Sequence, residues 1–388
     1  MDKKKICIIT TVSVTLKSFV IETAKYLYQT GKYDITLICS DDADFEKSLP
    51  DYLHFIPIKM SRGINLSGFS SILKFYNTFK KQKFDLVQYS TPNASCYASI
   101  AAFFARVPIR LYAQWGIRYV GLSGLSRKIF KLIEKTVCRL STNVRAVSPK
   151  NMQFAIEEKL YPAKKAKVVG NGGTIGVDLD AFNIDQREAY KKEIRNSLGL
   201  SDKDFVYGFV GRISVDKGCV ELLKAFKQLN KEYPSSKLLI VGPIEEDCGV
   251  DKALIEWAEK SPAVIFTGRV ENKDMNKYYS AFDVLVHPTY REGFGMVLQE
   301  AGALGVAIIT TNIPGASEVM VDGESCLLAE PKNKEDLLNK MELLIIDREK
   351  TSSLGMAGYL RTKQLYDRKI MLENQKNDYE FLLDGDLK

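Results

Sequence analysis

Short apolar runs alternate with segments of helical apolar spacing along most of the chain, and this alternation restricts the folds that the chain can form. Residues 3–10, 33–39 and 84–89 are apolar runs of strand length. Segments with the apolar spacing of a helix separate them, for example 19–30 and 69–82. Strands that alternate with helices pair in parallel, and helices cover both faces of their sheet. The pattern therefore predicts an α/β protein.

The alternation begins again in the second half of the chain, and its 388 residues suffice for two domains. A loop rich in glycine and polar residues occupies 171–182, and a new buried strand is expected at 204–210. Because ligands of such sheets bind at the carboxyl ends of the strands, we expect two Rossmann-like domains that face each other across a cleft. We expect the first domain at 1–182 and the second domain at 183–365. A C-terminal helix and its tail follow at 366–388.

Positive charge is concentrated in the first half of the chain. Residues 1–180 contain 27 Lys and Arg against 14 Asp and Glu, although the whole chain carries a net charge of only +7. Between Lys74 and Lys150, only Asp85 and Glu134 oppose fourteen basic residues. A half this basic indicates an anionic partner, which is a membrane surface, a nucleic acid or a phosphorylated substrate. A basic surface that only contacts water is the alternative.

Two basic segments of the first half place cations beside apolar residues. We interpret 74–83 and 127–135 as amphipathic basic helices that rest on an anionic membrane surface. The alternative is that their aromatic residues belong to the core. The residues concerned are Lys74, Phe75, Tyr76, Phe79, Lys80, Lys81 and Lys83 in the first segment, and Arg127, Lys128, Ile129, Phe130, Lys131, Leu132, Ile133 and Lys135 in the second.

Cysteine and hydropathy patterns indicate the compartment. The seven cysteines are scattered without a Cys-x-x-Cys pair, which favours buried thiols of a cytoplasmic protein over disulfides or metal ligands. The chain has no run of 18 apolar residues and no signal-peptide pattern at its start. We expect a cytoplasmic protein, bound peripherally to the cytoplasmic face of a membrane if the basic helices act as described.

Residues 211–218, with the sequence GRISVDKG, follow the first strand of the second domain. Gly211 permits a tight exit from the strand, and Gly218 precedes the next helix. Arg212 and Lys217 then lie at the carboxyl edge of the sheet, beside a helix N-terminus. Two cations at such a position suit a diphosphate, because arginine binds it bidentately and lysine as a point charge. Loop cations that only contact solvent are the alternative.

The stretch 282–305 forms a strand, a polar loop and a helix, and it carries two carboxylates. Gly293 and Gly295 turn the loop into the helix, so Glu292 lies in the loop and Glu300 in the helix. Eight residues rotate by about 800° in a helix, so the two carboxylates do not share a face. The strand, glycine turn and helix leave free backbone N–H groups at a positive helix end, which suits an anion or a polar hydroxylated ligand. An ordinary turn with two solvated glutamates is the alternative.

Together these segments resemble the retaining GT-B fold glycosyltransferases of group 1, family 4. The resemblance covers about 205–330, and NGGTIGVDLDAF at 171–182 resembles the interdomain segment of that family. It implies the GT-B fold, with a C-terminal helix that crosses back to the first domain. The matching segments are GRISVDKG, LLIVG, FTGRV, REGFGMVLQEAGALG and TTNIPGASEVMVDGESCLL.

The resemblance implies a role for each matching residue. Arg212 and Lys217 match the pair that neutralises the donor diphosphate, and Glu300 matches the glutamate that holds the ribose. Glu292 matches the glutamate beside the donor sugar, and we treat it as an electrostatic stabiliser and not as a nucleophile. Arg212, Lys217 and Glu292 are therefore the expected catalytic residues. The other expected donor contacts are Gly242, Arg269, Val270, Gly293, Phe294, Gly295, Met296 and Val297.

The first domain departs from the family in two places. Many relatives have a Gly-Gly loop after the first strand, where this chain has a polar loop at 11–18 without glycine. Many also have a histidine after the strand at 109–113, which is absent here. The expected acceptor-side residues are Thr11, Ser13, Thr15, Gln114, Trp115, Arg118 and Tyr119.

The resemblance also implies the partners. We expect the donor to be a nucleotide-sugar, specifically a UDP-sugar. We expect the acceptor to be a saccharide or a lipid-linked saccharide, a precursor of a surface polysaccharide. We expect no metal and no other cofactor. Asp42 and Asp44 spell the Asp-x-Asp metal signature of a different glycosyltransferase fold, but they fall in an acidic stretch, 40–46, that we interpret as a solvated loop.

Other function classes remain open at this point. A GT-B-like nucleotide-sugar epimerase or phosphorylase would share the fold, and so would a non-catalytic nucleotide-sugar binding protein. The absence of Gly-x-Gly-x-x-Gly after any strand disfavours a dinucleotide oxidoreductase. Beyond its charge, the chain has no feature of a nucleic-acid binder, so we expect no nucleic-acid partner.

Overall fold

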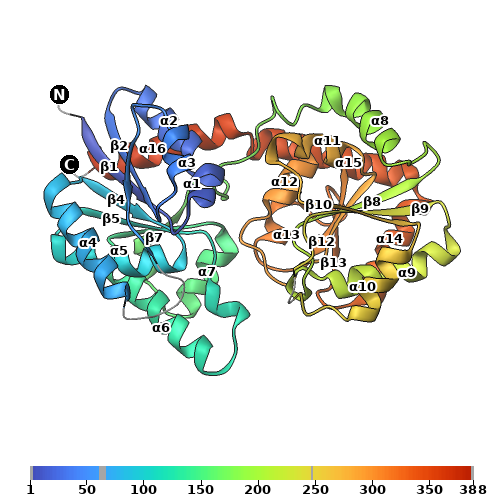
Figure 1. Ribbon diagram of the computed structural model, residues 1–388, viewed down its shortest axis with the longest axis horizontal. Coiled ribbons are helices and arrows are strands. Elements are labelled where there is room, and N and C mark those ends of the chain that lie inside the picture. Colours follow the sequence, from blue (N-terminus) through green and yellow to red (C-terminus); the bar gives the residue numbers. More distant parts are fainter. Residues whose placement is uncertain (1–2, 61–66, 246–247, 386–388) are drawn as a thin grey trace. The chain divides into compact units, whose positions relative to one another are not determined.

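The computed structural model describes residues 3–60, 67–245 and 248–385. The chain forms two compact units, each with one parallel sheet (Figure 1). The first unit consists of residues 1–175 and 369–388, and the second of residues 176–368. Residues 176–182, which we expected in the first domain, fold with the second unit because the Val177 N–H donates to the Tyr366 carbonyl at 2.8 Å.

The first unit contains a seven-stranded sheet in the order β3-β2-β1-β4-β5-β6-β7. Every recorded pair in this sheet is parallel, as the alternation of apolar runs predicted. Its strands are β1 (Lys4–Ile9), β2 (Tyr33–Cys39), β3 (His54–Pro57), β4 (Leu86–Tyr89), β5 (Ile109–Gln114), β6 (Asn143–Ala146) and β7 (Ala166–Val168).

Helices cover both faces of this sheet, because side chains alternate along each strand. Ile6 and Ile8 pack with α1–α3 and α16 on one face, and Cys7 and Ile9 pack with α4–α7 on the other. The helices are α1 (Ser13–Phe19), α2 (Ile21–Gln29), α3 (Ala43–Ser48), α4 (Ser67–Gln82), α5 (Pro92–Ala105), η1 (Arg118–Gly121), α6 (Gly124–Leu140), α7 (Pro149–Glu157), η2 (Ala163–Lys165) and α16 (Arg368–Asp384).

Two segments that we predicted as loops are helical. The polar stretch 11–18 contains most of α1, and the acidic stretch 40–46 leads into α3. The cause is local capping: the Asp42 carboxylate accepts the Phe45 N–H at 2.9 Å and so caps α3. The Ser13 hydroxyl also donates to Asp42, which connects the two short helices. Periodicity could not reveal helices of six and seven residues.

The C-terminal helix α16 belongs to the first unit, which confirms the predicted return of the chain. Its Asp378 carboxylate accepts a hydrogen bond from Arg145 Nε at 2.7 Å, and both side chains are less than 10% exposed. The Tyr379 hydroxyl donates to Gln88 Oε1 at 2.6 Å. A buried ion pair is costly to break from one side, so these contacts fix the helix against β4 and β6.

The second unit contains a six-stranded parallel sheet in the order β10-β9-β8-β11-β12-β13. Its strands are β8 (Phe205–Val210), β9 (Ser236–Val241), β10 (Val264–Gly268), β11 (Val284–His287), β12 (Ala307–Thr311) and β13 (Leu327–Ala329). Its helices are η3 (Ile184–Gln186), α8 (Arg187–Ser197), η4 (Val215–Lys217), α9 (Cys219–Glu232), α10 (Lys252–Lys260), η5 (Asn272–Asp274), α11 (Met275–Ser280), α12 (Met296–Ala303), α13 (Ala316–Val319), α14 (Lys334–Ile346) and α15 (Arg348–Leu365).

The strand order of the second unit reverses between β8 and β11. From β8 the chain continues to β9 on one side, and β11 pairs with β8 on the other side. The connections after β8 and β11 therefore run in opposite directions. A crevice forms between them at the carboxyl ends of these two strands. Ligands of open α/β sheets bind at such a reversal. The segment 211–218 follows β8, and the loop that carries Glu292 follows β11.

Candidate functional site

The loop after β8 lies directly against the loop after β11. Gly218 separates η4 from α9 with φ +71°, a conformation that favours glycine. A Cβ atom at Gly218 would lie 2.0 Å from the Pro288 carbonyl oxygen. Any larger residue would therefore separate the two loops. This close approach brings Lys217 within reach of the residues that follow His287.

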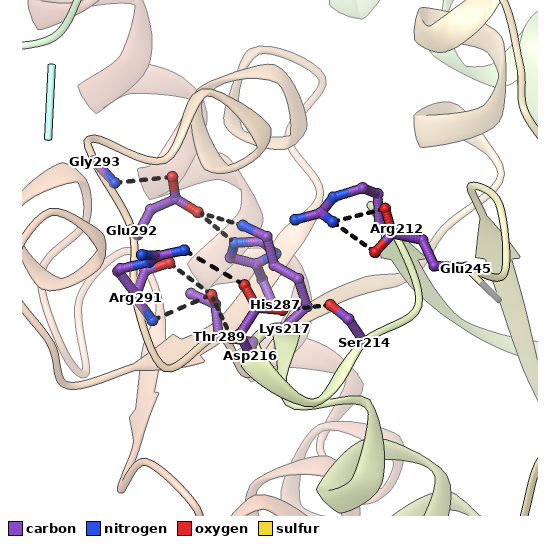
Figure 2. A network of polar contacts seen from close by, with 10 residues as sticks. All are labelled: Arg212, Ser214, Asp216, Lys217, Glu245, His287, Thr289, Arg291, Glu292 and Gly293. Carbon is purple, nitrogen blue, oxygen red and sulfur yellow. Dashed lines mark hydrogen bonds and ion pairs between the residues drawn. The ribbon is translucent and has the colours of Figure 1, made fainter. Parts of the chain in front are cut away.

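Glu292 is held by three donors (Figure 2). Its Oε2 atom lies 3.1 Å from Lys217 Nζ and 3.0 Å from His287 Nε2, and its Oε1 atom accepts the Gly293 N–H at 3.0 Å. The side chain of His287 is 1% exposed and that of Glu292 is 18% exposed. The carboxylate therefore has a fixed orientation at the carboxyl end of β11.

The partners of Glu292 determine its charge. Burial by itself would raise the pKa of this carboxyl, but the hydrogen bond from His287 and the positive charge of Lys217 outweigh it and hold the pKa well below its usual range. Burial also lowers the pKa of His287. A neutral imidazole beside an ionised carboxylate carries its proton on Nε2, where it donates to Glu292. Lys217 is then the cation that balances Glu292.

Arg212 has a carboxylate partner of its own. Its Nη1 atom lies 2.7 Å and 2.6 Å from the two carboxylate oxygens of Glu245, in the loop after β9 (Figure 2). The two side chains are 51% and 39% exposed, so water screens their attraction. Both cations of the GRISVDKG motif are thus paired with glutamates. The roles of Glu245 and His287 could not be predicted from the sequence, because residue spacing does not show which side chains they contact.

A second set of contacts ties the two loops together. Asp216 accepts a hydrogen bond from the Ser214 hydroxyl at 2.5 Å, and its carbonyl accepts the Tyr290 N–H at 2.9 Å. The Arg291 guanidinium lies 3.8 Å from the Asp216 carboxylate. The Thr289 hydroxyl donates to the Arg291 carbonyl at 2.9 Å. These contacts hold the loop that carries Lys217 against the loop that carries Glu292.

Glu300 lies in a different environment, inside α12. Its Oε2 atom accepts the Tyr279 hydroxyl at 2.6 Å. Burial raises the pKa of Glu300 to about 7, although the hydrogen bond from Tyr279 and the charge of Arg368 oppose this change. Glu300 therefore titrates near neutral pH, whereas Glu292 stays ionised.

The other predicted donor residues lie at neighbouring strand ends of the same sheet. Gly242 directly follows β9 with φ +147°, and a Cβ atom there would lie 1.9 Å from the Gly211 carbonyl oxygen. Arg269 is exposed and Val270 half-buried, both just after β10. Gly295 caps α12 in the left-handed region. Four further predicted residues, Gly293, Phe294, Met296 and Val297, flank this cap.

Two of the predicted acceptor-side residues are interior residues of the first unit, which corrects our prediction for them. Gln114 is 1% exposed, donates to Glu134 at 2.6 Å and accepts from the Tyr161 hydroxyl at 2.9 Å. Tyr119 is fully buried and donates to Glu158 at 3.0 Å. With these partners, both side chains stabilise the core and are unavailable to a ligand.

The remaining acceptor-side candidates lie nearer the surface, except for Ser13. Thr11 and Thr91 share a hydrogen bond of 2.8 Å at the carboxyl ends of β1 and β4, where the strand order of this sheet reverses. Thr15 is half-buried, and Ser13 is 6% exposed and bonded to Asp42.

Trp115 and Arg118 each contact an aromatic ring. Trp115 packs on Phe19 with ring centroids 5.6 Å apart and borders a cavity of about 60 Å³. The Arg118 guanidinium lies 4.7 Å from the centroid of the Phe130 ring.

The basic segments of the first unit differ in part from our prediction. Phe75 and Phe79 are at most 2% exposed and belong to the core, so the alternative reading is correct for them. Leu132 in the second segment is instead 66% exposed and does not belong to the core. None of the helices in the described ranges has the length and hydropathy of a membrane span. The same ranges contain no group of His, Cys, Asp or Glu side chains arranged to hold a metal ion.

Comparisons with known proteins identify the family. Residues 190–361 match the model of the glycosyl transferases group 1, and residues 5–148 match that of the glycosyl transferase 4-like family. The capsular polysaccharide biosynthesis glycosyltransferase CapM of Staphylococcus aureus is 31% identical over 350 residues, which cover 90% of each chain. The chain is a group 1 glycosyltransferase.

Two further proteins resemble this glycosyltransferase over most of its length. One is the Escherichia coli UDP-Gal:α-D-GlcNAc-diphosphoundecaprenol α-1,3-galactosyltransferase, which is 25% identical over 82% of this chain and 81% of its own. The other is the crystal structure of Anabaena HepE in complex with UDP and glucose. It has a TM-score of 0.79 at 20% identity and covers 97% of this chain and 99% of its own. This structural likeness confirms the predicted GT-B fold.

Proposed function

We propose that the enzyme moves a sugar, with retention of anomeric configuration, from a UDP-linked donor to a growing polyprenyl-diphosphate-linked saccharide, a surface-polysaccharide precursor. Two relatives support the acceptor class: one is named for capsular polysaccharide biosynthesis, and the other acts on a sugar linked to diphosphoundecaprenol. HepE, the structural relative, binds UDP and glucose and supports the donor class.

The cluster of Lys217, Glu292 and His287 beside Arg212 is the observation that carries the proposal. It lies at the carboxyl ends of β8 and β11, where the strand order reverses. Lys217 and Arg212 would exchange their glutamate partners for the donor diphosphate. There they stabilise the negative charge that develops when the bond between the anomeric carbon and the diphosphate breaks.

Glu292 would act by charge and not by covalent attack. A carboxylate whose pKa is held well below its usual range is a weak base and a weak nucleophile. It can still stabilise the positive charge that develops at the anomeric carbon. The acceptor hydroxyl oxygen then forms the new bond on the face that the diphosphate leaves, and the hydroxyl proton passes to the departing diphosphate.

The neighbouring residues would hold the rest of the donor. Glu300 is suited to accept hydrogen bonds from the ribose hydroxyls, and Val270 to pack beside the base. The backbone at Gly242 and Arg269 and along 293–297 would contact the diphosphate and the sugar. In the first unit, Thr11, Thr15, Trp115 and Arg118 remain the acceptor-side candidates. A lipid-linked acceptor would place the enzyme at the cytoplasmic face of a membrane.

Nucleotide release from a panel of UDP-, GDP- and ADP-sugars tests this proposal. The wild type is compared with Lys217→Ala, Glu292→Gln and, as a matched surface control, Lys273→Ala. We expect release from UDP-sugars, a large loss in the first two variants, no change in the control and no effect of EDTA. Unchanged release in Lys217→Ala and Glu292→Gln would refute the site assignment. An inverted anomeric signal in the NMR spectrum of the product would refute retention.

A further inference from the structure

The outer surface of one helix layer in the first unit exposes an unusual amount of apolar side chain. Helices α4, α5 and α6 pack side by side, with α5 between the other two, on the sheet face that carries Cys7 and Ile9. Single exposed apolar residues are ordinary, but a group of them marks an interaction site. Seven large apolar side chains of these helices are exposed: Phe69, Leu73, Phe103, Phe104, Leu125, Ile129 and Leu132.

These side chains form a groove and a stripe. Phe69, Leu73 and Phe104 are 81%, 58% and 65% exposed and border an open apolar groove of about 360 Å³ between α4 and α5. On α6, Leu125 and Leu132 are 72% and 66% exposed and lie seven residues apart, on the same side of the helix. Neither feature is covered by another part of the chain that the structure describes.

The charges on the same helices all have one sign at the surface. Helices α4, α5 and α6 contain eight Lys and Arg residues and a single acidic residue, Glu134. Glu134 is buried and accepts hydrogen bonds from Tyr112 and Gln114, so it does not offset the surface charge. Lys74, Lys128 and Lys135 are exposed and form no ion pair with any described residue.

We infer that this surface, the outer face of α4, α5 and α6, docks on an anionic lipid bilayer. The apolar side chains would enter the boundary between headgroups and acyl chains, while the lysine ammonium groups contact anionic headgroups. A protein partner fits less well, because lysine is depleted from protein interfaces. Such a partner would also have to place acidic groups opposite a surface that exposes lysines and no carboxylate. The inference deepens the proposed function by naming the surface that would bring a lipid-linked acceptor to the first unit.

Co-sedimentation with vesicles tests the inference without donor or acceptor. The full chain is mixed with vesicles of phosphatidylglycerol and phosphatidylethanolamine, or of phosphatidylcholine alone. One variant combines Phe69→Ser and Phe104→Ser, and a second combines Lys74→Glu, Lys128→Glu and Lys135→Glu. The matched controls lie on exposed positions of the second unit: Ile346→Ser, and the triple change Lys203→Glu, Lys224→Glu and Lys231→Glu.

We expect the wild type and both controls to bind the anionic vesicles. Both test variants should bind at least tenfold less, because the first loses apolar side chains that would enter the headgroup boundary and the second loses three cations that would contact anionic headgroups. Binding to phosphatidylcholine should be weak throughout. Equal binding of the test variants and the wild type would overturn the inference. So would a homodimer that Phe69→Ser with Phe104→Ser dissociates, since the face would then belong to a second copy. Neither result depends on whether the enzyme transfers sugar.

A different observation carries a second inference, which concerns His287. This imidazole is buried, and of the three donors to Glu292 among the described residues it is the one that is neither a lysine nor a backbone group. No described residue bonds its Nδ1 atom. Lys217 must leave Glu292 if it is to bind a diphosphate, and of the donors in the described part of the chain the carboxylate then keeps His287 and the Gly293 N–H.

We propose that His287 is a positioning residue that holds the Glu292 carboxylate in place while Lys217 moves to the donor. The proposal rests on the proposed role of Glu292. His287→Leu should lower kcat about tenfold with little change in KM, since the donor contacts remain, and it should move the acid limb of the kcat profile to higher pH. His287→Gln, which keeps an N–H donor, should restore most of the activity.

Turnover is measured with whichever of UDP-glucose, UDP-galactose and UDP-N-acetylglucosamine releases nucleotide fastest. If Glu292→Gln lowers kcat but His287→Leu does not, the positioning role is wrong and the proposed function stands. If Glu292→Gln itself has no effect, the proposed function of the site is wrong. Equal losses in His287→Leu and His287→Gln, without a change in the pH profile, would mean that His287 only stabilises the fold.

Discussion

Glu292 and Glu300 are eight residues apart in one motif, but the protein treats them in opposite ways. Burial disfavours the ionised form of both carboxyls. At Glu292 the hydrogen bond from His287 and the charge of Lys217 outweigh burial, so the pKa is held well below its usual range. Among the described residues, Glu300 accepts a hydrogen bond from Tyr279, and burial raises its pKa to about 7. The number and charge of the partners, and not the depth of burial, therefore decide the charge state of each glutamate.

The two glutamates also contribute oppositely to the pH dependence of stability. The pKa of Glu292 is lower in the folded chain than in the unfolded chain, so its contribution is present above pH about 4.5 and is lost as the pH falls. The pKa of Glu300 is higher in the folded chain. Its ionisation therefore reduces stability as the pH rises from about 4.5 through about 7.

The largest effect is expected from neutralising Glu292. Glu292→Gln should lower kcat on the order of 100-fold, the loss typical of removing one group that stabilises a transition state. Glu300→Gln should instead raise the donor KM and leave kcat nearly unchanged, because it would remove a contact made equally in the ground state and the transition state. Steady-state kinetics of both variants on one UDP-sugar separate the two outcomes. A similar kcat loss in both variants would show that the glutamates do not differ in role.

The next effect concerns pH. If the Glu300 carboxylate accepts hydrogen bonds from ribose, UDP affinity should rise about tenfold from pH 6 to pH 8, as a group with a pKa of about 7 becomes ionised. Calorimetric titration of UDP at several pH values measures this rise. Glu300→Gln is the control, since it retains the titration of UDP itself. An equally steep rise in Glu300→Gln would exclude Glu300 as its source.

A smaller effect is expected at Tyr279, whose hydroxyl bonds Glu300. Tyr279→Phe keeps the buried ring but removes the donor that stabilises the ionised carboxylate. UDP affinity at pH 8 should fall about fivefold, and the midpoint of the pH dependence should move to higher pH. The same calorimetric titrations test this expectation. A midpoint that moves to lower pH would contradict the assigned hydrogen bond.

The smallest effect is expected at Glu245, an exposed counterpart of Glu292. Removal of its charge by Glu245→Gln frees Arg212 from a competing carboxylate. UDP should then bind about twofold more tightly at low salt, since exposed ion pairs contribute about 0–1 kcal/mol. Glu271→Gln, which removes an exposed partner of Lys273 in the same unit, should leave affinity unchanged. Weaker UDP binding in Glu245→Gln would indicate that this carboxylate positions Arg212 for the donor.

Much of the fold could be predicted from local pattern. Apolar runs such as 33–39 and 204–210 have the length and composition of buried parallel strands, and both are strands in the structure. The short helix α3 could not be predicted in this way, because its start depends on a capping contact of Asp42. Residues 176–182 were placed in the wrong unit because composition cannot show that Val177 bonds Tyr366.

The sequence predicted only those residues of the candidate site that belong to a recognisable motif. Lys217 and Glu292 fall in recognisable segments, and the structure joins them across 75 residues. Gln114 lies at a strand end that suggests a ligand, yet its side chain turns into the core to bond Glu134. His287 lies in an apolar strand and has no distinguishing neighbour in sequence. Side-chain direction and partners depend on tertiary packing, which spacing does not encode.

The contacts of α16 have a consequence for the order in which the protein is made. Arg145 of the first unit is balanced by Asp378, and Gln88 by Tyr379, so the first unit requires residues near the end of the chain. A ribosome must synthesise the whole second unit, residues 176–368, before that helix emerges. At typical elongation rates this delay lasts roughly 10–40 s. The nascent first unit therefore lacks the carboxylate partner of Arg145, and α16 does not yet cover its part of the sheet face, until the second unit has been synthesised.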